Sequence, residues 1–338
     1  TPGGAVEPTV IPARTPGMPP IDGVTPAPEV STGAAAELSF SVQTYPVPPG
    51  AHPHDVAVAS DGGIWYTGQL NGTLGWLDPA TGEVREADLP DGAAPHGVVT
   101  GPDGAAWVTD QGADAIIRVT PGDLGVDVFP MPAGARGMGP HTGVFDRDGI
   151  LWFTGAGGVV ARLDPATGEI EAYDAPRGSW PYGITVTPSN DIWFVSLAKS
   201  YLGKVDKVTG EVTVIEPPTP NAGTRRVWSD SRGRLWVSYW TAGMVAVHDP
   251  ADGTWREWDL PGGDNAAYSI YVDELDGVWL SDFSQNAIVR FDPDTETFQS
   301  FPSDRDNAGV RQMLGRPGEA WGAESGQDRL VVVRYEAR

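Results

Sequence analysis

The stretch PHDVAVASDGGIWYTG, residues 53–68, contains the pattern that decides the fold of this chain. Similar stretches begin at Pro95, Pro140 and Pro181, each with a tryptophan at the matching place. Seven tryptophans keep this register at intervals of 41 to 45 residues: Trp65, Trp107, Trp152, Trp193, Trp236, Trp279 and Trp321. A repeat of that length is typical of a four-stranded propeller blade, and the repeated tryptophan suits a packing role between blades.

Each repeat predicts four short strands. The first ends at a turn such as Asp-Gly, and the second carries the tryptophan. The third resembles TLGWLDPATG (residues 73–82), whose Asp-Pro turn places proline where turns favour it. The fourth resembles VREADLP (residues 84–90). The sequence therefore predicts an all-β protein, a seven-bladed β-propeller with four antiparallel strands per blade.

The last repeat stops after three strands, at LVVVRYEAR (residues 330–338). The segment LSFSVQTYPVP (residues 38–48) has the pattern of the missing fourth strand. We therefore predict that this N-terminal strand completes the last blade, which would close the ring and remove its open edges.

Residues 1–37 differ from the repeats in composition. Eight prolines fall between Pro2 and Pro28, and apolar residues are too sparse to offset the entropy of ordering the segment. We expect a disordered proline-rich tail over residues 1–37 and the propeller over residues 38–338. The tail composition and the absence of cysteine together predict a secreted or cell-surface protein.

Charge and cysteine content exclude several classes of function. The net charge of −23 opposes binding to phosphate backbones, so nucleic acid is not an expected partner. The lack of cysteine excludes a thiolate nucleophile and cysteine-ligated zinc. No apolar run reaches the length of a membrane span. We expect a monomer that acts on a small molecule or an oligosaccharide.

Two positions of the repeat vary and are predicted to lie together at the mouth of the central channel. The position eleven residues before each tryptophan holds His54, His96, His141, Tyr182, Arg225, Tyr268 and Val310. The position three residues after it holds Gly68, Asp110, Gly155, Ser196, Tyr239, Asp282 and Glu324. Three of the five histidines of the chain share the first position, while the other four blades lack histidine there, which argues against a purely structural requirement.

Two kinds of chemistry suit this set of residues. Neutral imidazoles from His54, His96 and His141 could ligate a transition metal such as copper, iron or zinc, with Asp110 completing or orienting the set. The same imidazoles, with neighbouring tyrosines and a cation, suit proton transfer. Spacing alone does not separate the two. The predicted substrate-binding residues are His52, Trp180, Tyr182, Arg225, Tyr239 and Tyr268.

The motif PHGV at residues 95–98 and the turn DPATGEI at residues 164–170 resemble the virginiamycin B lyase family, and the resemblance extends over residues 38–338. It implies a seven-bladed propeller that opens a cyclic depsipeptide by Mg²⁺-dependent elimination across the ester C–O bond. It also implies two catalytic histidines in Pro-His motifs on adjacent blades, and a glutamate fourteen residues after the second.

Carried over by position, this pattern makes His54, His96 and Asp110 the catalytic residues. The alternative pair, His96 and His141, would place Gly155 where the glutamate is required. Asp110 is one methylene shorter than the glutamate of the family, and the third aligned histidine is a further departure.

We therefore expect a carbon–oxygen lyase that acts by β-elimination on a cyclic depsipeptide or an acidic carbohydrate, in which case Arg225 would neutralise a uronate. Two alternatives are a three-histidine copper or iron oxidoreductase and a propeller that binds a ligand or protein without catalysis.

Overall fold

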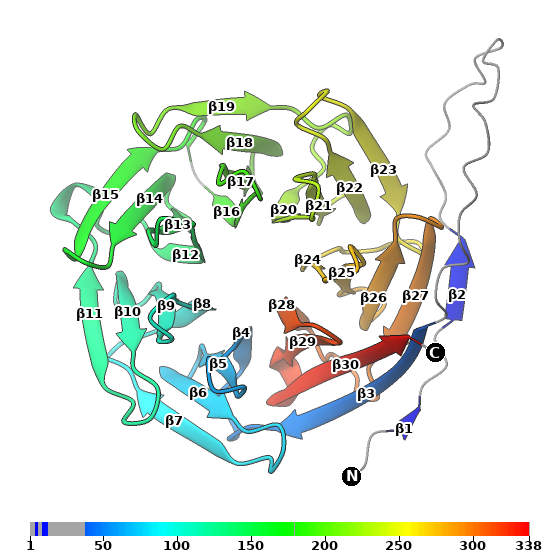
Figure 1. Cartoon of the computed structure of the whole chain (residues 1–338), viewed down its shortest axis with the longest axis horizontal. Coiled ribbons are helices and arrows are strands. Elements are labelled where there is room, and N and C mark those ends of the chain that lie inside the picture. The colour runs from blue at the N-terminus through cyan, green and yellow to red at the C-terminus, as the bar shows by residue number, and fades with distance from the viewer. Residues whose placement is uncertain (1–3, 6–8, 13–37, 179, 338) are drawn as a thin grey trace.

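The computed structural model describes residues 4–5, 9–12, 38–178 and 180–337, and it forms a ring of seven sheets around a central axis (Figure 1). The predicted seven-bladed propeller with antiparallel four-stranded blades is confirmed. The expected disorder of the tail concerns residues that lie almost entirely outside this description.

The first six blades run outward from the axis in chain order, and so do the first three strands of the last blade. The innermost strands are β4 (Pro53–Val58), β8 (Pro95–Thr100), β12 (Pro140–Phe145), β16 (Pro181–Val186), β20 (Thr224–Ser229), β24 (Tyr271–Val272) and β28 (Val310–Arg316). The second strands, which carry the repeated tryptophan, are β5 (Ile64–Gly68), β9 (Ala106–Asp110), β13 (Leu151–Gly155), β17 (Ile192–Ser196), β21 (Leu235–Tyr239), β25 (Val278–Asp282) and β29 (Glu319–Glu324).

The outer half of each blade completes the ring. The third strands are β6 (Thr73–Leu77), β10 (Ala115–Val119), β14 (Val159–Asp164), β18 (Tyr201–Val205), β22 (Met244–His248), β26 (Ala287–Asp292) and β30 (Arg329–Ala337). The fourth strands are β7 (Val84–Asp88), β11 (Val126–Pro130), β15 (Glu169–Asp174), β19 (Val212–Ile215), β23 (Trp255–Asp259), β27 (Thr297–Pro302) and, for the last blade, β3 (Leu38–Pro46). Two short 3-10 helices, η1 (Ala133–Ala135) and η2 (Ser325–Gln327), lie in the connections.

The first and last strands of the propeller close the ring as predicted. β3 pairs antiparallel with β30 along its whole length, from Leu38 opposite Ala337 to Pro46 opposite Arg329. Two further strands lie outside this closure: β1 (Gly4–Ala5) pairs with β3, and β2 (Thr9–Pro12) pairs with β27. These short segments of the N-terminal region therefore form fifth strands on the last two blades.

The repeated tryptophans pack between blades as predicted. Trp236, which is fully buried, shares one apolar cluster with Val245 of its own blade and with Ile270 and Val289 of the next blade. Replacing a buried tryptophan of this kind by alanine typically costs about 3–5 kcal/mol of stability. These residues therefore set the angle between blades and hence the width of the channel.

A hydroxyl two residues after the tryptophan fixes the innermost strands. Thr109 Oγ1 donates to the backbone oxygen of His141 in the next blade at 2.7 Å and accepts the amide of Gly97 in its own blade at 3.0 Å. Thr67, Thr154 and Ser238 make the same pair of bonds, toward His96, Tyr182 and Tyr268 respectively. The hydroxyl of the Trp-x-Thr/Ser element therefore links the backbones of two neighbouring innermost strands, which carry the residues that face the axis.

Glycine in the Pro-His-Gly and Pro-Tyr-Gly motifs is required by close packing between blades. A Cβ atom on Gly183 would lie 2.7 Å from the Cα atom of Arg226 in the next blade. Within the described residues, no helix has the length and apolar character needed to cross a membrane.

Candidate functional site

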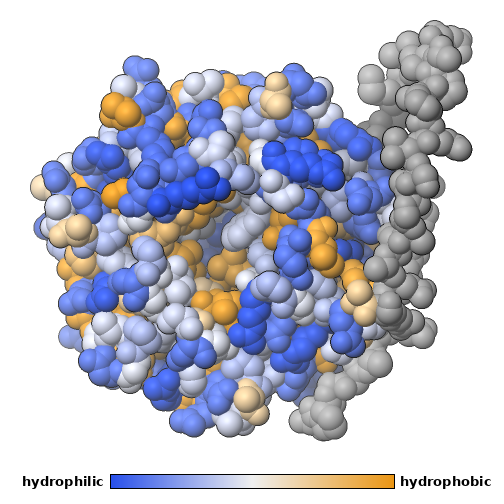
Figure 2. All heavy atoms as spheres, viewed as in Figure 1, coloured by the Kyte–Doolittle hydropathy of each residue, from blue (hydrophilic) through white to orange (hydrophobic). Residues whose placement is uncertain are grey.

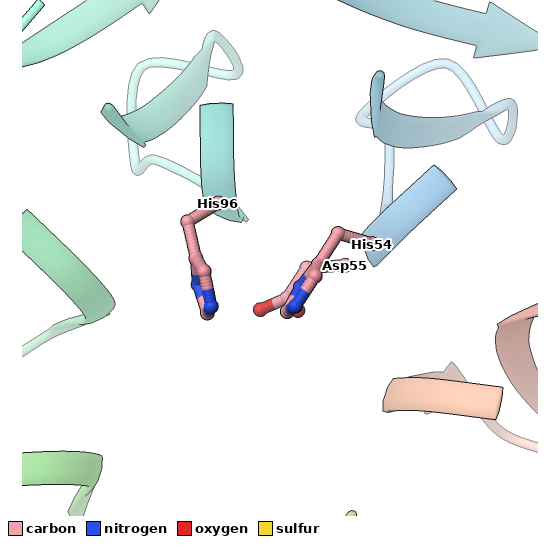
Figure 3. A group of neighbouring side chains, drawn as sticks. All are labelled: His54, Asp55 and His96. Carbon is pink, nitrogen blue, oxygen red and sulfur yellow. The ribbon is translucent and has the colours of Figure 1, made fainter. Parts of the chain in front are cut away.

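Seven side chains form a belt around the axis at the start of the innermost strands. We call this the axial belt, and its members are His54, His96, His141, Tyr182, Arg225, Tyr268 and Arg311. The ring centroids of His54 and His96 are 3.9 Å apart, those of His96 and His141 3.8 Å, and those of His141 and Tyr182 3.8 Å. The structure therefore brings the three predicted histidines together, and Figure 3 shows the side chains of His54 and His96 extending next to each other into the centre of the ring.

Arg225 and Arg311 complete the belt on the side opposite His96. Arg225 Nη2 donates to the Tyr182 hydroxyl at 2.6 Å, and its guanidinium carbon lies 3.7 Å from the centre of the Tyr268 ring. Arg311 Nη1 lies 3.4 Å from the Tyr268 hydroxyl. The belt thus has three imidazoles on one side and two phenols with two guanidiniums on the other.

Arg311, rather than the predicted Val310, is the belt residue of the last blade. In this blade Val310, eleven residues before the tryptophan, pairs with Glu324. In the first blade the residue with the equivalent pairing, Pro53 opposite Gly68, lies twelve residues before its tryptophan. The innermost hairpin of the last blade is one residue shorter, and counting back from the tryptophan therefore missed the arginine. The short Arg-Pro-Gly-Glu turn at residues 316–319 was the available signal.

The residues three places after the tryptophan do not share the mouth with the belt. They pair with the residue preceding each belt member, and successive side chains of a strand point to opposite faces. Asp110 accepts the backbone amides of Ala94 at 3.0 Å and Ala113 at 2.7 Å, and among the described residues it makes no hydrogen bond to a histidine. Asp282 holds its own loop in the same way.

Tyr239, predicted to bind substrate, lies in the core between blades. Its side chain is fully buried in an apolar cluster with Trp193, Leu202 and Met244. The prediction for this residue is corrected because its strand register turns the ring away from the axis.

A second polar layer lies beneath the belt and was missed from the sequence. Asp55 Oδ1 lies 2.7 Å from His54 Nδ1 and 3.4 Å from Arg226 Nη2, and Arg226 Nη1 donates to Thr142 Oγ1 at 2.8 Å. Asp55 and Arg226 are almost fully buried. These residues follow the belt positions directly, where blades two and four carry glycine, and comparison of this next position around the ring would have found them.

Burial keeps the three imidazoles neutral. Burial first, and then the positive charge of neighbouring groups, lowers the pKa values of His54, His96 and His141 well below the usual value of 6.5. The Nδ1 atom of His54 faces the carboxylate of Asp55, and that of His96 lies 2.9 Å from the backbone oxygen of His141. Both contacts place the single proton on Nδ1 and leave Nε2 as an acceptor.

The two tyrosines of the belt have pKa values shifted in opposite directions. Burial raises the pKa of Tyr182 far above its usual range. Burial acts in the same direction on Tyr268, but Arg225, Arg226 and Arg311 together lower its pKa to about 8. The Tyr268 hydroxyl lies 3.2 Å from that of Tyr182 and 3.4 Å from His54 Nε2. A readily ionised phenol therefore stands between a persistent donor and an imidazole acceptor.

Trp180 stands at the edge of the belt, where entrance residues were predicted. Its indole is 46% exposed and is nearly parallel to the Tyr182 ring, at an interplanar angle of 12°. The other predicted entrance residue, His52, is half-buried, and its backbone amide donates to Asp328 at 2.7 Å. The centre of the ring is visibly hollowed on the face shown in Figure 2.

The belt residues do not fit the Mg²⁺ ion that the family resemblance implies. Mg²⁺ prefers oxygen ligands in octahedral geometry, whereas the belt itself has no carboxylate and Asp55, in the layer beneath it, already faces His54 and Arg226. A transition metal could be held by a different set of ligands, since the ligand atoms of His54, Asp55 and His96 lie within 4.8 Å of one another. That group contains Asp55 in place of the predicted His141, whose Nδ1 lies 2.8 Å from Thr142 Oγ1.

Comparison with known proteins agrees with the repeat. The model of the virginiamycin B lyase family matches residues 28–290. A virginiamycin B lyase from Nocardia farcinica (strain IFM 10152) is 29% identical over 158 residues, which is 46% of this chain and 52% of that protein. The alignment thus spans about half the length of this curated relative.

Solved structures show the same fold. A selenomethionine-substituted virginiamycin B lyase from Staphylococcus aureus superposes with a TM-score of 0.81 at 20% identity, over 87% of this chain and 99% of that one. A catalytically inactive histidine-to-alanine variant of the Staphylococcus aureus enzyme, solved with quinupristin, gives a TM-score of 0.80 at 21% identity, with coverage of 87% and 99%.

Proposed function

The chain belongs to the virginiamycin B lyase family, and on that basis we propose that it is a carbon–oxygen lyase that acts by β-elimination at the axial belt. The observation that carries the proposal is the position of the Tyr268 hydroxyl, which lies within 3.4 Å of His54 Nε2, Tyr182 and Arg311. Pairs of titratable groups whose pKa values are driven apart are typical of acid–base sites.

The reaction needs a base, an acid and positive charge. Tyr268, in the ionised form that the neighbouring guanidiniums favour, removes the proton from the carbon next to a carbonyl or carboxyl group. The electron pair of that C–H bond forms the new C=C bond as the C–O bond at the β carbon breaks. The departing oxygen keeps the electron pair of the C–O bond and takes a proton from Tyr182, or leaves as a carboxylate. Arg225 and Arg311 stabilise the negative charge that develops meanwhile.

The roles of the remaining polar residues follow from their contacts. Asp55 holds the His54 ring so that Nε2 faces Tyr268. His96 offers a second unprotonated Nε2 atom on the same side of the channel. Asp110 supports the loop that precedes β8 and takes no part in proton transfer.

The substrate need not be the antibiotic of the family. The family pattern requires a histidine and, fourteen residues later, a glutamate in the same blade. Here the three blades that carry a histidine have Gly68, Asp110 and Gly155 at the position of that glutamate. The one glutamate at this position of the repeat, Glu324, belongs to the last blade, which contributes Arg311 rather than a histidine. A cyclic depsipeptide lactone and an acidic carbohydrate are both chemically suited to elimination.

The test is to incubate the full chain with a type B streptogramin and, separately, with acidic oligosaccharides, in water labelled with oxygen-18. Elimination yields an unsaturated product without incorporation of label from water, and Tyr268→Phe abolishes it. Incorporation of label would mean hydrolysis, and no turnover of either class would favour a binding propeller.

A metal-dependent oxidoreductase is the second candidate, supported by the proximity of His54, Asp55 and His96. Three guanidiniums around the group oppose a bound cation, so we favour the lyase. Near-stoichiometric copper, iron or zinc in the purified protein, lost together in His54→Ala and His96→Ala, would reverse this preference.

A further inference from the structure

Two arginines of the belt have no carboxylate partner. Among the described residues, Arg225 and Arg311 donate only to the hydroxyls of Tyr182 and Tyr268, and their Nε atoms are buried without any hydrogen-bond partner. Arg225 and Arg311 are partly buried, whereas the partly buried Arg329 and the almost fully buried Arg226 and Arg290 are paired with acids: Glu324, Asp55 and Asp273 respectively. Buried charges are normally paired or bind a ligand, so these two guanidiniums are suited to an anion.

The contrast with the rest of the chain strengthens this argument. The chain carries 45 acidic against 22 basic residues, yet the centre of the ring collects three guanidiniums around a single carboxylate. A cationic site inside an acidic protein attracts small anions locally, whereas the acidic exterior repels large polyanions such as nucleic acid.

Trp180 adds a flat aromatic surface beside Tyr182, whose hydroxyl accepts a hydrogen bond from Arg225. Its backbone has a φ of +73°, which is unusual for a bulky residue, and hydrogen bonds to Ala156 and Leu197 hold it in that conformation. The exposed indole therefore has a fixed orientation, parallel to Tyr182. An exposed, fixed tryptophan beside an anion site suits a ligand that has both an apolar ring face and a carboxylate.

We propose that Arg225 and Arg311 bind the carboxylate of a uronic acid and that Trp180 stacks on a sugar ring of the same chain, so that the substrate is an acidic oligosaccharide. The inference rests on the proposed elimination at the same belt and names its substrate class. The guanidiniums acidify the C–H bond beside the bound carboxylate, Tyr268 takes that proton, the C–O bond to the next sugar breaks, and Tyr182 protonates the departing oxygen. The products are an unsaturated uronate and a shortened chain.

Binding can be measured separately from turnover. Titration calorimetry of the full-length Tyr268→Phe variant with trigalacturonate should show binding, because this substitution leaves both guanidiniums and Trp180 in place. Adding Arg225→Gln or Arg311→Gln should weaken binding by roughly 10–100-fold, the range expected for a lost charge-assisted contact. Adding Trp180→Ala should weaken it by roughly tenfold. The matched control is Arg85→Gln, which removes an arginine stacked on Trp76 away from the belt.

Further binding and turnover measurements identify the chemical class of the ligand. Fully methyl-esterified trigalacturonate should bind at least about tenfold more weakly, since it lacks the charge that the guanidiniums recognise. A glutamate-rich peptide that bound as tightly as trigalacturonate would overturn the assignment to a sugar. Elimination of a depsipeptide without any binding of trigalacturonate would overturn this inference and leave the lyase proposal standing. Binding of trigalacturonate by the wild-type chain, without elimination of either trigalacturonate or a streptogramin, would support the sugar site and overturn the lyase.

Discussion

The hydroxyl oxygens of Tyr182 and Tyr268 lie 3.2 Å apart, although the two residues come from blades four and six. One phenol has a pKa far above its usual range, and the other has a pKa of about 8. Burial raises both pKa values, and the neighbouring Tyr268 raises that of Tyr182 further, whereas Arg225, Arg226 and Arg311 together outweigh burial at Tyr268. Two identical functional groups in one cluster therefore have different chemistry at neutral pH.

The first prediction concerns Tyr268 itself. Tyr268→Phe should keep the fold, because the ring still stacks on Phe283 at 4.5 Å, but it should lower the rate of elimination by ~10²–10⁴-fold, as loss of a general base does. Steady-state kinetics with any turned-over substrate checks this. Tyr173→Phe, which removes a hydroxyl bonded to Glu171 on the outer strand β15, should retain full activity. Equal rates in the wild type and Tyr268→Phe would exclude the phenol as the base.

The second prediction is a pH profile. Because the active form of Tyr268 is ionised, kcat/KM should rise with pH through about 8 and then level off. Arg311→Gln removes one of the charges that lower this pKa, so the midpoint of the rise should move to higher pH. A midpoint that stays in place would show that another group controls the rate.

The third prediction concerns stability in acid. The folded-state pKa values of His54, His96 and His141 are below the value of 6.5 expected for the unfolded chain. The unfolded chain therefore binds more protons below about pH 6.5, and the free energy of unfolding should fall with decreasing pH by up to ~1.4 kcal/mol per pH unit for each histidine. Denaturant unfolding between pH 8 and 5 measures the slope. His141→Gln should reduce it, and an unchanged slope would contradict the burial of a neutral imidazole there.

The fourth prediction distinguishes two aspartates. Asp55→Asn should retain the fold and lower activity by ~10–100-fold, because the orientation of His54 depends on this carboxylate. Asp110→Asn should instead lower the melting temperature with little effect on kcat, since Asp110 holds backbone amides of its loop. The reverse pattern would restore Asp110 to the catalytic set.

The fifth prediction concerns ring closure. Of the elements that the structure describes, deleting residues 1–36 removes just the two short outer strands β1 and β2, and it should change thermal unfolding little. Deleting residues 1–48 also removes β3 with the buried Phe40, Tyr45 and Val47, and should cost at least ~5 kcal/mol. Thermal unfolding of both truncations checks this, and equal stability would refute the role of β3.

The sequence was sufficient to predict the fold because its signal is repeated. One tryptophan per blade, the Asp-Pro turns and the incomplete last repeat together indicated the blade number and the closing strand. The cluster of His54, His96 and His141 followed from the same alignment. Arg311 did not, because a hairpin shortened by one residue shifts the register of the last blade.

Asp110 and Asp55 show the other limit of the alignment. A side chain's place in the repeat does not reveal which face of the sheet it occupies: Asp110 pairs with Pro95, the residue before His96, so the side chains of Asp110 and His96 lie on opposite faces. Asp110 therefore points to its loop. Asp55, which was not singled out, points into the channel, where its side-chain partners are His54 of its own blade and Arg226 of blade five.

The pairing of β3 with β30 also determines when the molecule can be completed. Ser39 and Glu336 are hydrogen-bonded neighbours although 297 residues separate them along the chain. A nascent chain cannot form this contact until Glu336 has been synthesised, and contacts of such long range are slow to form. Until then the six complete blades form an open arc with two unprotected ends. Because belt members from the first and last blades meet across this gap, the chain can acquire its complete axial site only in the final step of folding.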